Sequence, residues 1–201
     1  KHIYGDGLPS ASEILRVFNF GEGIDLNSPV MEEARFIGHQ VHAGIETFIN
    51  TGELVCHDDF VWGDTRYQNC MSAFKKWHKD KKIIPIATEV KFVSKRLGFG
   101  GTIDIVCFLD GQLTIGDWKT GRNKYQDFIQ IELYSLLLRE CTGIIARDVM
   151  LLHLNKETGE AKERRCPDRV KSKAFALQVL RFYRKTEDFK KLVDGRRRIE
   201  I

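Results

Sequence analysis

Hydrophobic residues recur at helical spacing in the first third of the chain. Ser10 and Glu13 have the spacing of a capping box, so a short helix is expected to follow Ser10. Pro29 opens a longer helical pattern that ends near Gly52, and Asp64 is placed to cap a third helix. Apolar residues three or four positions apart predict the buried face of each helix. In the second helix they are Val30, Ala34, Ile37, Val41, Ile45 and Phe48, and in the third Tyr67, Met71, Phe74 and Trp77.

Beyond residue 82 the helical spacing gives way to extended segments rich in Ile, Val, Thr and Phe. Asp110-Gly111 separates two of these segments and predicts a two-residue hairpin turn. Consecutive strands joined by such short turns form an antiparallel meander. The three expected strands cover residues 83–94, 98–109 and 112–120.

The last third of the chain returns to helix and then alternates. A helix is expected over residues 125–141, a strand over 148–155, a short polar edge strand after the turn at 157–160, and a basic amphipathic helix over 173–192. The whole order predicts an α+β fold, an α/β sandwich in which helices flank the faces of a central mixed sheet.

Size and composition are those of one ordinary globular domain. The chain has 201 residues, of which 42% are hydrophobic and 30% charged, so we expect a single domain over residues 1–201. No apolar run approaches the roughly 18 residues that cross a bilayer, and the first residues have no apolar signal core, so we expect no membrane association. Five scattered cysteines without zinc spacing favour reduced thiols and a cytoplasmic location.

Positive charge gathers at the C-terminal end. Residues 162–201 hold 14 Lys and Arg against 6 Asp and Glu, whereas the rest of the chain carries a net negative charge. A basic end suits a phosphate backbone, although a solvated helix face gives the same pattern.

Two carboxylates are expected to meet on neighbouring strands. In a hairpin turning at Asp110-Gly111, residues whose numbers sum to 221 lie opposite one another, so Asp104 faces Asp117. Facing carboxylates repel unless a cation lies between them, and oxygen ligands favour Mg²⁺ or Mn²⁺. Lys119 points to the same face as Asp117 and could stabilise charge on a phosphate or help to activate water. The alternative is a structural ion pair beside a strand-end cap.

Three ordered motifs resemble the core of the PD-(D/E)XK nuclease superfamily, in particular its RecB-type exonuclease branch with phage and mitochondrial members. They are Gly101-Thr-Ile-Asp104, Asp117-Trp-Lys119 and Gln130-Ile-Glu-Leu-Tyr134, which match the GxxD, DxK and QxxxY patterns of that branch. The expected αβββαβ order is also that of the family core. The resemblance covers about residues 8–155 and leaves a basic helical extension over about 168–201.

The resemblance implies a role for each matching residue. Asp104, Asp117 and the backbone carbonyl of Trp118 would hold the metal, and Lys119 would be the catalytic lysine. The segment Gly38-His39-Gln40-Val41-His42 is similar to the family's GxxxH segment, in which the histidine is a further metal ligand. Gln130 and Tyr134 share a helix face that borders the site and contacts DNA in the family, although Tyr134 also fits a core aromatic. Glu89 either supports the metal and lysine or is an exposed strand residue.

Together, these expectations predict a metal-dependent DNA nuclease that uses one or two Mg²⁺ or Mn²⁺ ions. An exonuclease on single strands or duplex ends is favoured; the alternatives are a structure-specific endonuclease or a non-catalytic nucleic-acid-binding module. Late cysteines are too few for the iron–sulfur cluster of some relatives. DNA is the expected partner, with a homo-oligomer or a separate recombination or replication protein also compatible. The basic residues expected to follow the DNA backbone are Lys171, Lys173, Arg181 and Arg184.

Overall fold

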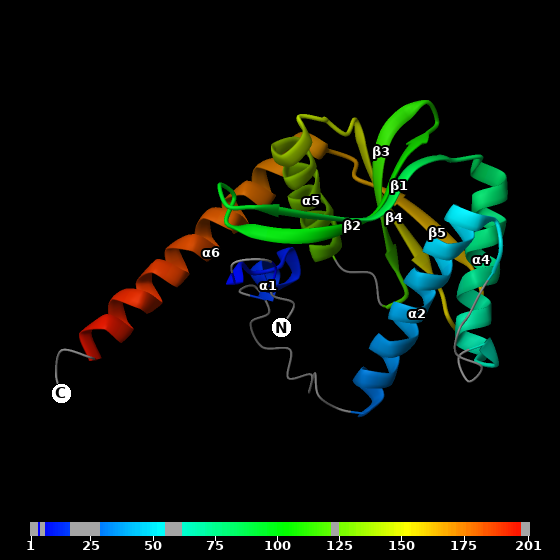
Figure 1. Ribbon diagram of the computed structural model, residues 1–201, viewed down its shortest axis with the longest axis horizontal. Helices are drawn as coiled ribbons and strands as arrows, with labels where there is room; N and C mark the ends of the chain where they lie inside the picture. The colour runs from blue at the N-terminus through cyan, green and yellow to red at the C-terminus, as the bar shows by residue number, and fades with distance from the viewer. Residues whose placement is uncertain (1–3, 5–6, 17–28, 55–61, 122–124, 198–201) are drawn as a thin grey trace.

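The computed structural model describes residues 4, 7–16, 29–54, 62–121 and 125–197. In this part of the chain helices flank a five-stranded mixed sheet, which confirms the predicted α+β fold (Figure 1). The strands are β1 (Ile84–Ser94), β2 (Phe99–Leu109), β3 (Gln112–Lys119), β4 (Asp148–Leu154) and β5 (Ala161–Arg165). The helices are α1 (Ala11–Leu15), α2 (Pro29–Thr51), α4 (Thr65–Lys81), α5 (Gln126–Thr142) and α6 (Arg169–Arg197).

Local capping groups set several helix ends where the sequence predicts them. The Ser10 hydroxyl accepts a hydrogen bond from the Glu13 amide at the start of α1, and the Asp64 carboxylate accepts one from the Arg66 amide at the start of α4. One prediction is wrong: Val30, expected on the buried face of α2, is 73% exposed. It lies in the first turn of α2, and the first fully buried side chain of that helix is Ile37.

The sheet order is β1-β2-β3-β4-β5, with one change of direction. The first three strands form the predicted antiparallel meander, and Leu109 pairs with Gln112 across the two-residue turn. β3 and β4 are parallel, so the chain needs a crossover between them, and α5 provides it. β5 is the predicted edge strand and pairs antiparallel with β4.

Two hydrophobic clusters lie on the two sides of the sheet. One joins the sheet to α1, α5 and α6, and the other joins it to α2 and α4. Ile103 and Ile105 lie on the same face of β2, but Ile103 belongs to the first cluster and Ile105 to the second. Asp104 therefore lies between two residues that pack into different cores.

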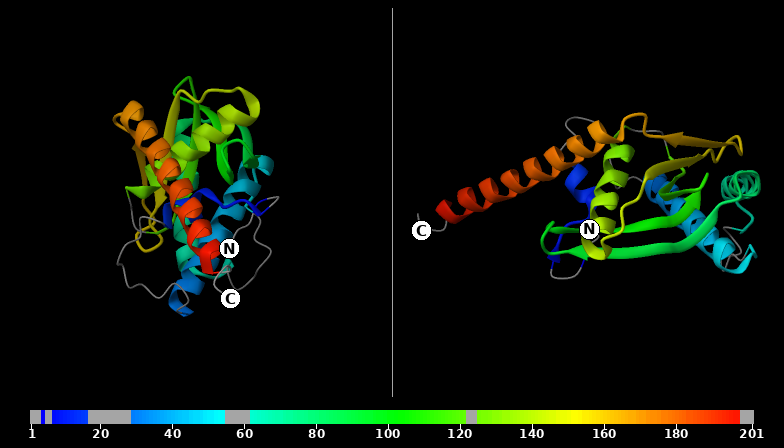
Figure 2. Two further views of the ribbon diagram at one scale, coloured as in Figure 1. Left: turned by 90° about the vertical axis from the view of Figure 1, so that its left-hand side faces the viewer. Right: turned by 90° about the horizontal axis from the view of Figure 1, so that it is seen from above.

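The last helix is longer than predicted. α6 begins at Arg169 rather than near residue 173 and continues to Arg197. Its inner face packs on α1 and α5 through the buried residues Ala176, Val179 and Leu180. Figures 1 and 2 show its C-terminal part projecting away from the rest of the described chain. Within the described residues, no helix combines the length and apolar character that spanning a bilayer requires.

Candidate active site

Three carboxylates form one row across the first three strands. Thr88 pairs with Ile105 and Val90 with Ile103, so Glu89 lies opposite Asp104 between these pairs. On the other side of β2 the register that pairs Ile105 with Gly116 brings Asp117 opposite Asp104. Residues opposite one another on adjacent strands point to the same face. The row of Glu89, Asp104 and Asp117, called the acidic row below, therefore concentrates negative charge in one place.

The strands open slightly where the acidic row crosses them. The ladder between β2 and β3 ends at the pair of Ile105 and Gly116. Two residues beyond Gly116, the Trp118 amide donates to Asp104 Oδ2 at 2.7 Å, so a side chain takes the place of a backbone partner. The amide and carbonyl of a strand residue point to the same neighbour, so the Trp118 carbonyl also faces the side of β2.

Glu89 adopts a backbone conformation that is unusual for a strand residue. Its φ is +48°, in the left-handed region, and the regular pairing of β1 with β2 skips it. Such a conformation costs roughly 1–2 kcal/mol for a residue other than glycine. Glu89 Oε1 is buried, and no described residue donates a hydrogen bond to it. Backbone strain and an unsatisfied carboxylate oxygen at the same residue indicate a functional constraint.

His42 reaches the acidic row from α2. Its Nδ1 lies 3.3 Å from Asp104 Oδ2 and 3.8 Å from Glu89 Oε1. Burial alone would lower the pKa of His42, but the charge of Asp104 and the neighbouring carboxylates outweigh burial and raise it to about 10. The imidazole therefore holds a proton that partly balances the acidic row, and a metal cation would take over that role.

Lys119 extends from the end of β3 and pairs with Asp117. Lys119 Nζ lies 2.6 Å from Asp117 Oδ2 and donates to Gln130 Oε1 at 2.8 Å. Burial raises the pKa of Asp117 to about 6, against the opposing effect of Lys119 and with a further increase from Asp104. Burial would lower the pKa of Lys119, but Asp117 outweighs burial and the net shift is upward. Lys119 is therefore an ammonium ion at neutral pH.

The predicted helix face of α5 completes the wall of the site. Gln130 Nε2 donates to the Tyr134 hydroxyl at 2.9 Å and to the Ser12 hydroxyl of α1 at 2.8 Å. Tyr134 is only 7% exposed and belongs to the core, so the core interpretation of this residue also holds. A Cβ at Gly101 would lie 2.5 Å from the Tyr134 ring. The glycine of the GxxD motif is thus explained by the close approach of the tyrosine.

These residues line one cleft of about 850 Å³. The lining includes His42, Gln130, Tyr134, Lys119 and the acidic row. Basic side chains that sequence reasoning did not select also line it. Arg35 lies seven residues before His42 on the same face of α2, and Lys91 lies two residues after Glu89; both spacings were available signals. Further lining residues without such a signal are Tyr4, Ser12, His39 and Lys156.

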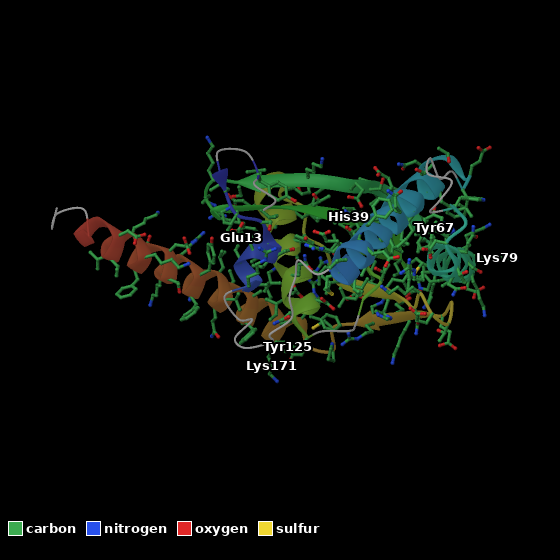
Figure 3. The ribbon with its side chains drawn as sticks, turned by 90° about the horizontal axis from the view of Figure 1, so that it is seen from below. Glu13, His39, Tyr67, Lys79, Tyr125 and Lys171 are labelled. Atoms are coloured by element: carbon green, nitrogen blue, oxygen red, sulfur yellow. The ribbon has the colours of Figure 1, made fainter. Side chains whose placement is uncertain are left out.

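Four basic residues are predicted to contact the DNA backbone. They lie on α6 and do not line this cleft: Lys171, Lys173, Arg181 and Arg184. Figure 3 shows Lys171 well away from His39, which is at the cleft. Lys173 is partly buried, and burial lowers its pKa. Arg184 donates to the Leu97 carbonyl in the turn between β1 and β2. Arg181 is exposed.

The donor set fits a divalent metal ion. Nδ1 or Nε2 of His42 and single carboxylate oxygens of Glu89 and Asp104 all lie within 4.8 Å of one another. The unsatisfied oxygen of Glu89 and the raised pKa of His42 both reflect the negative charge of the acidic row, which a cation would offset. An oxygen-rich set suits Mg²⁺ or Mn²⁺. Asp117 and the Trp118 carbonyl border the same place.

Comparison with known families identifies the class of protein. The model of the PD-(D/E)XK nuclease superfamily matches residues 17–198. This range is most of the chain, so the chain belongs to that superfamily, as its motifs predict. Members of the superfamily use divalent metal ions. No curated protein sequence matches the chain.

Solved structures share the fold at low sequence identity. One is LHK-Exo, an alkaline exonuclease from Laribacter hongkongensis, in complex with dAMP: 13% identity, 96% of this chain and 94% of that chain covered, and a TM-score of 0.50. Another is a putative exonuclease from Eubacterium rectale: 12% identity, 81% of this chain and 68% of that chain covered, and a TM-score of 0.54. At these identities the similarity shows the fold.

Proposed function

We propose that this chain is a divalent-metal-dependent deoxyribonuclease, an exonuclease acting on single-stranded DNA or duplex ends. The observation that carries the proposal is the acidic row, which His42 meets from one side and Lys119 from the other in a single cleft. The exonuclease assignment is supported by the two similar solved structures, which are described as an exonuclease with dAMP and a putative exonuclease.

His42, Glu89, Asp104, Asp117 and the Trp118 carbonyl would hold the metal. When bound, a divalent ion lowers the pKa of the attacking water and neutralises charge on the phosphate. Water would lose a proton to the solvent as it attacks phosphorus in line, the bond to the leaving oxygen would break, and that oxygen would take up a proton from the solvent. The chain itself supplies fixed charge and orientation for this step.

Lys119 supplies positive charge at the reacting phosphate. Because its pKa is raised, it is a poor proton acceptor, and it acts as a charged donor to an oxygen of the phosphate or to the attacking water. Gln130 holds the ammonium group through its carbonyl oxygen and is itself fixed by its contacts with Ser12 and Tyr134. Burial, followed by the charges of Asp117 and Asp104, raises the pKa of Tyr134 well above its usual value, so its hydroxyl stays protonated.

The basic side chains at the cleft would bind the substrate independently of its base sequence. Arg35, Lys91 and Lys156 come from α2, β1 and the turn after β4, and all three line the cleft that holds the acidic row. Contacts of this kind go to phosphates and are weakened by salt. We therefore expect little base preference and strong salt dependence.

The test is digestion of end-labelled linear and closed circular DNA, single-stranded and double-stranded, with Mg²⁺, Mn²⁺ or EDTA. Lys119→Ala is compared with the parent, and Lys162→Ala, an exposed lysine of β5 outside the cleft, is the matched control. We expect metal-dependent loss of linear DNA only, abolished by Lys119→Ala and retained by Lys162→Ala. Cleavage of circles would replace the exonuclease with an endonuclease, and binding without cleavage under every metal would leave a binding module.

A further inference from the structure

A further set of side chains lies next to the acidic row on the hairpin of β1 and β2. Thr102 is two residues before Asp104 on β2, so both side chains point to the same face of the sheet. Lys91 pairs with Thr102 and shares that face. Thr102 and Lys91 both line the cleft. Two strand residues span about 6.6 Å, which is close to the separation of neighbouring phosphates in an extended single strand.

Tyr4 adds an aromatic ring at this place. Its hydroxyl is hydrogen-bonded to the Thr102 hydroxyl at 3.0 Å, and its backbone amide donates to the Leu8 carbonyl at 3.1 Å. A Cβ at Gly100 would lie 2.5 Å from the Tyr4 ring, so the ring lies against the bare backbone of β2. Tyr4 is half-buried and lines the cleft, so part of its side chain is accessible to a ligand. Tyr4, Thr102 and Lys91 are called the second row below.

The second row differs from the acidic row in charge and in chemistry. The acidic row holds three carboxylates, which suit a metal ion, whereas the second row holds a cation, a hydroxyl and a ring. Lys91 is exposed, and Lys91 and Tyr4 both adjoin Thr102. A cation beside an aromatic ring suits a nucleotide, because the phosphate contacts the cation and the base stacks on the ring. One nucleotide therefore fits the second row when the neighbouring phosphate lies at the acidic row.

We propose that the second row is the subsite for the nucleotide next to the phosphate that is cut. Lys91 binds the phosphate of that nucleotide, and the ring of Tyr4 stacks on its base. This inference rests on the proposed function, because it places the reacting phosphate at the acidic row. An unpaired base can turn its face to the ring, whereas a base in a duplex is already paired and stacked on its neighbours. The subsite therefore takes a nucleotide of a single strand.

Tyr4 also has a structural role, which the test must separate from binding. The Gly100 amide donates to the Pro9 carbonyl at 3.0 Å, so the segment before α1 lies along β2, and Tyr4 helps to hold it there (Figure 1). Loss of this role would alter the cleft for every strand, with or without bases. Loss of stacking would affect only strands that carry bases. A strand without bases therefore distinguishes the two roles.

Binding is measured in EDTA, so that the result does not depend on catalysis. The probe is a fluorescein-labelled strand of about eight thymidine nucleotides, a length within the usual site sizes of single-strand-binding folds. The comparison strand has the same number of phosphates and an abasic sugar at every position. Fluorescence anisotropy gives the affinity for each strand. Tyr4→Leu removes the ring, Tyr4→Phe keeps it, and Lys91→Met removes the charge. Lys162→Met, at the exposed lysine of β5 outside the cleft, is the matched control.

We expect the parent to bind the thymidine strand about fivefold or more tightly than the abasic strand. Tyr4→Leu should abolish this preference by lowering the affinity for the thymidine strand alone, and Tyr4→Phe should retain it. Lys91→Met should weaken binding of both strands by the same factor. It should also reduce the slope of log affinity against log salt by about 0.7, because one phosphate contact is lost. Lys162→Met should bind both strands as the parent does.

Cleavage then locates the subsite relative to the cut. Strands with a single abasic residue at successive positions are digested in Mn²⁺ under single-turnover conditions, and the rate at each link is read from a gel. In the parent, cutting should slow by about fivefold at a link whose neighbouring residue is abasic. Tyr4→Leu should show no such dependence. Slowing that occurs only for abasic residues further from the cut would overturn the assignment to the neighbouring nucleotide.

Three results of the binding measurement would overturn the proposal. If the parent binds the two strands equally, no base is stacked, and this comparison needs no variant that has to fold. If Tyr4→Leu weakens both strands equally, the ring only holds the segment before α1 on β2. If Tyr4→Phe loses the preference, it belongs to the hydroxyl pair with Thr102. Absence of cleavage with every metal would instead overturn the proposed function, and the binding result would still decide whether the second row holds a nucleotide.

Discussion

Buried charges occur at two places in this molecule, and they are arranged in opposite ways. At the joint of α5 and α6, Glu132 is fully buried, and both of its oxygens accept hydrogen bonds from Arg169 at 3.0 Å. Arg169 also donates to the Ser135 hydroxyl and to the Ala146 carbonyl. Each charge thus has its counter-charge and a closed set of partners. The result is a joint that fixes the start of α6 on α5.

The acidic row, by comparison, lacks such a closed set of counter-charges and hydrogen-bond partners. Three carboxylates share Lys119 and a protonated His42, and one oxygen of Glu89 has no hydrogen-bond donor among the described residues. A buried carboxylate with a raised pKa costs the fold free energy wherever it is ionised. The comparison shows how the same residue types serve two purposes. Closed pairs position helices, whereas an unbalanced group retains the capacity to bind a cation and a phosphate.

The largest expected effect comes from matched amide substitutions, one in each place. Asp117→Asn should reduce cleavage by about a thousandfold, while the melting temperature in EDTA stays the same or rises. The reason for the second effect is that the pKa of Asp117 is raised to about 6, so above that pH its ionised form destabilises the fold, and asparagine removes the charge. Single-turnover cleavage and thermal unfolding measure the two quantities.

Glu132→Gln is the control for that prediction, because it makes the same chemical change at the closed pair. It should lower the melting temperature and leave cleavage per folded molecule unchanged. A loss of stability in Asp117→Asn as large as that in Glu132→Gln would remove the distinction between the two places.

The next effect in size concerns stability alone. Arg169→Met should destabilise the protein by about 3 kcal/mol, because it leaves Glu132 buried without a counter-charge. Urea unfolding followed by circular dichroism measures the change in the free energy of unfolding. Arg169→Lys should cost less, since it keeps the charge and loses the two-pronged geometry. If both variants unfold like the parent, the joint does not depend on this pair.

The sequence is sufficient to predict much of the site, because hairpin geometry is local. A two-residue turn sets the register between β2 and β3, so the facing positions of Asp104 and Asp117 follow from counting. The positive φ of Glu89 does not follow from its neighbours, because strand propensity favours extended backbone there. Its place in the acidic row depends on how β1 pairs with β2.

Long-range packing limits the prediction in the same way elsewhere. The sequence identifies His42 only through a resemblance, and its contact with Asp104 depends on how α2 lies on the sheet. Lys156 reaches the cleft from a turn far along the chain, and no periodic pattern marks it. The start of α6 has both a local and a long-range support: the Asp168 carboxylate accepts a hydrogen bond from the Lys171 amide, and Arg169 pairs with Glu132, 37 residues away in the sequence.

The smallest effect for each step measured, about tenfold per pH unit, is a pH dependence that only the acidic row should have. A metal ion must displace the proton of His42, whose pKa is about 10, and below pH 6 also that of Asp117. Affinity for Mn²⁺ should therefore rise about tenfold per pH unit between roughly pH 6 and 10, and more steeply below that range. Electron paramagnetic resonance of free Mn²⁺ in titrations at several pH values measures the affinity.

His42→Ala provides the contrast for this prediction. It should weaken binding of Mn²⁺ at high pH and flatten the rise above about pH 6, because no imidazole proton remains to be displaced. The steeper part below that pH should survive, since it belongs to Asp117. If the affinity of the parent for Mn²⁺ stays constant between about pH 6.5 and 8.5, the metal does not displace the proton of His42, and His42 lies outside the metal site. The acidic row would then bind the ion through its oxygens alone.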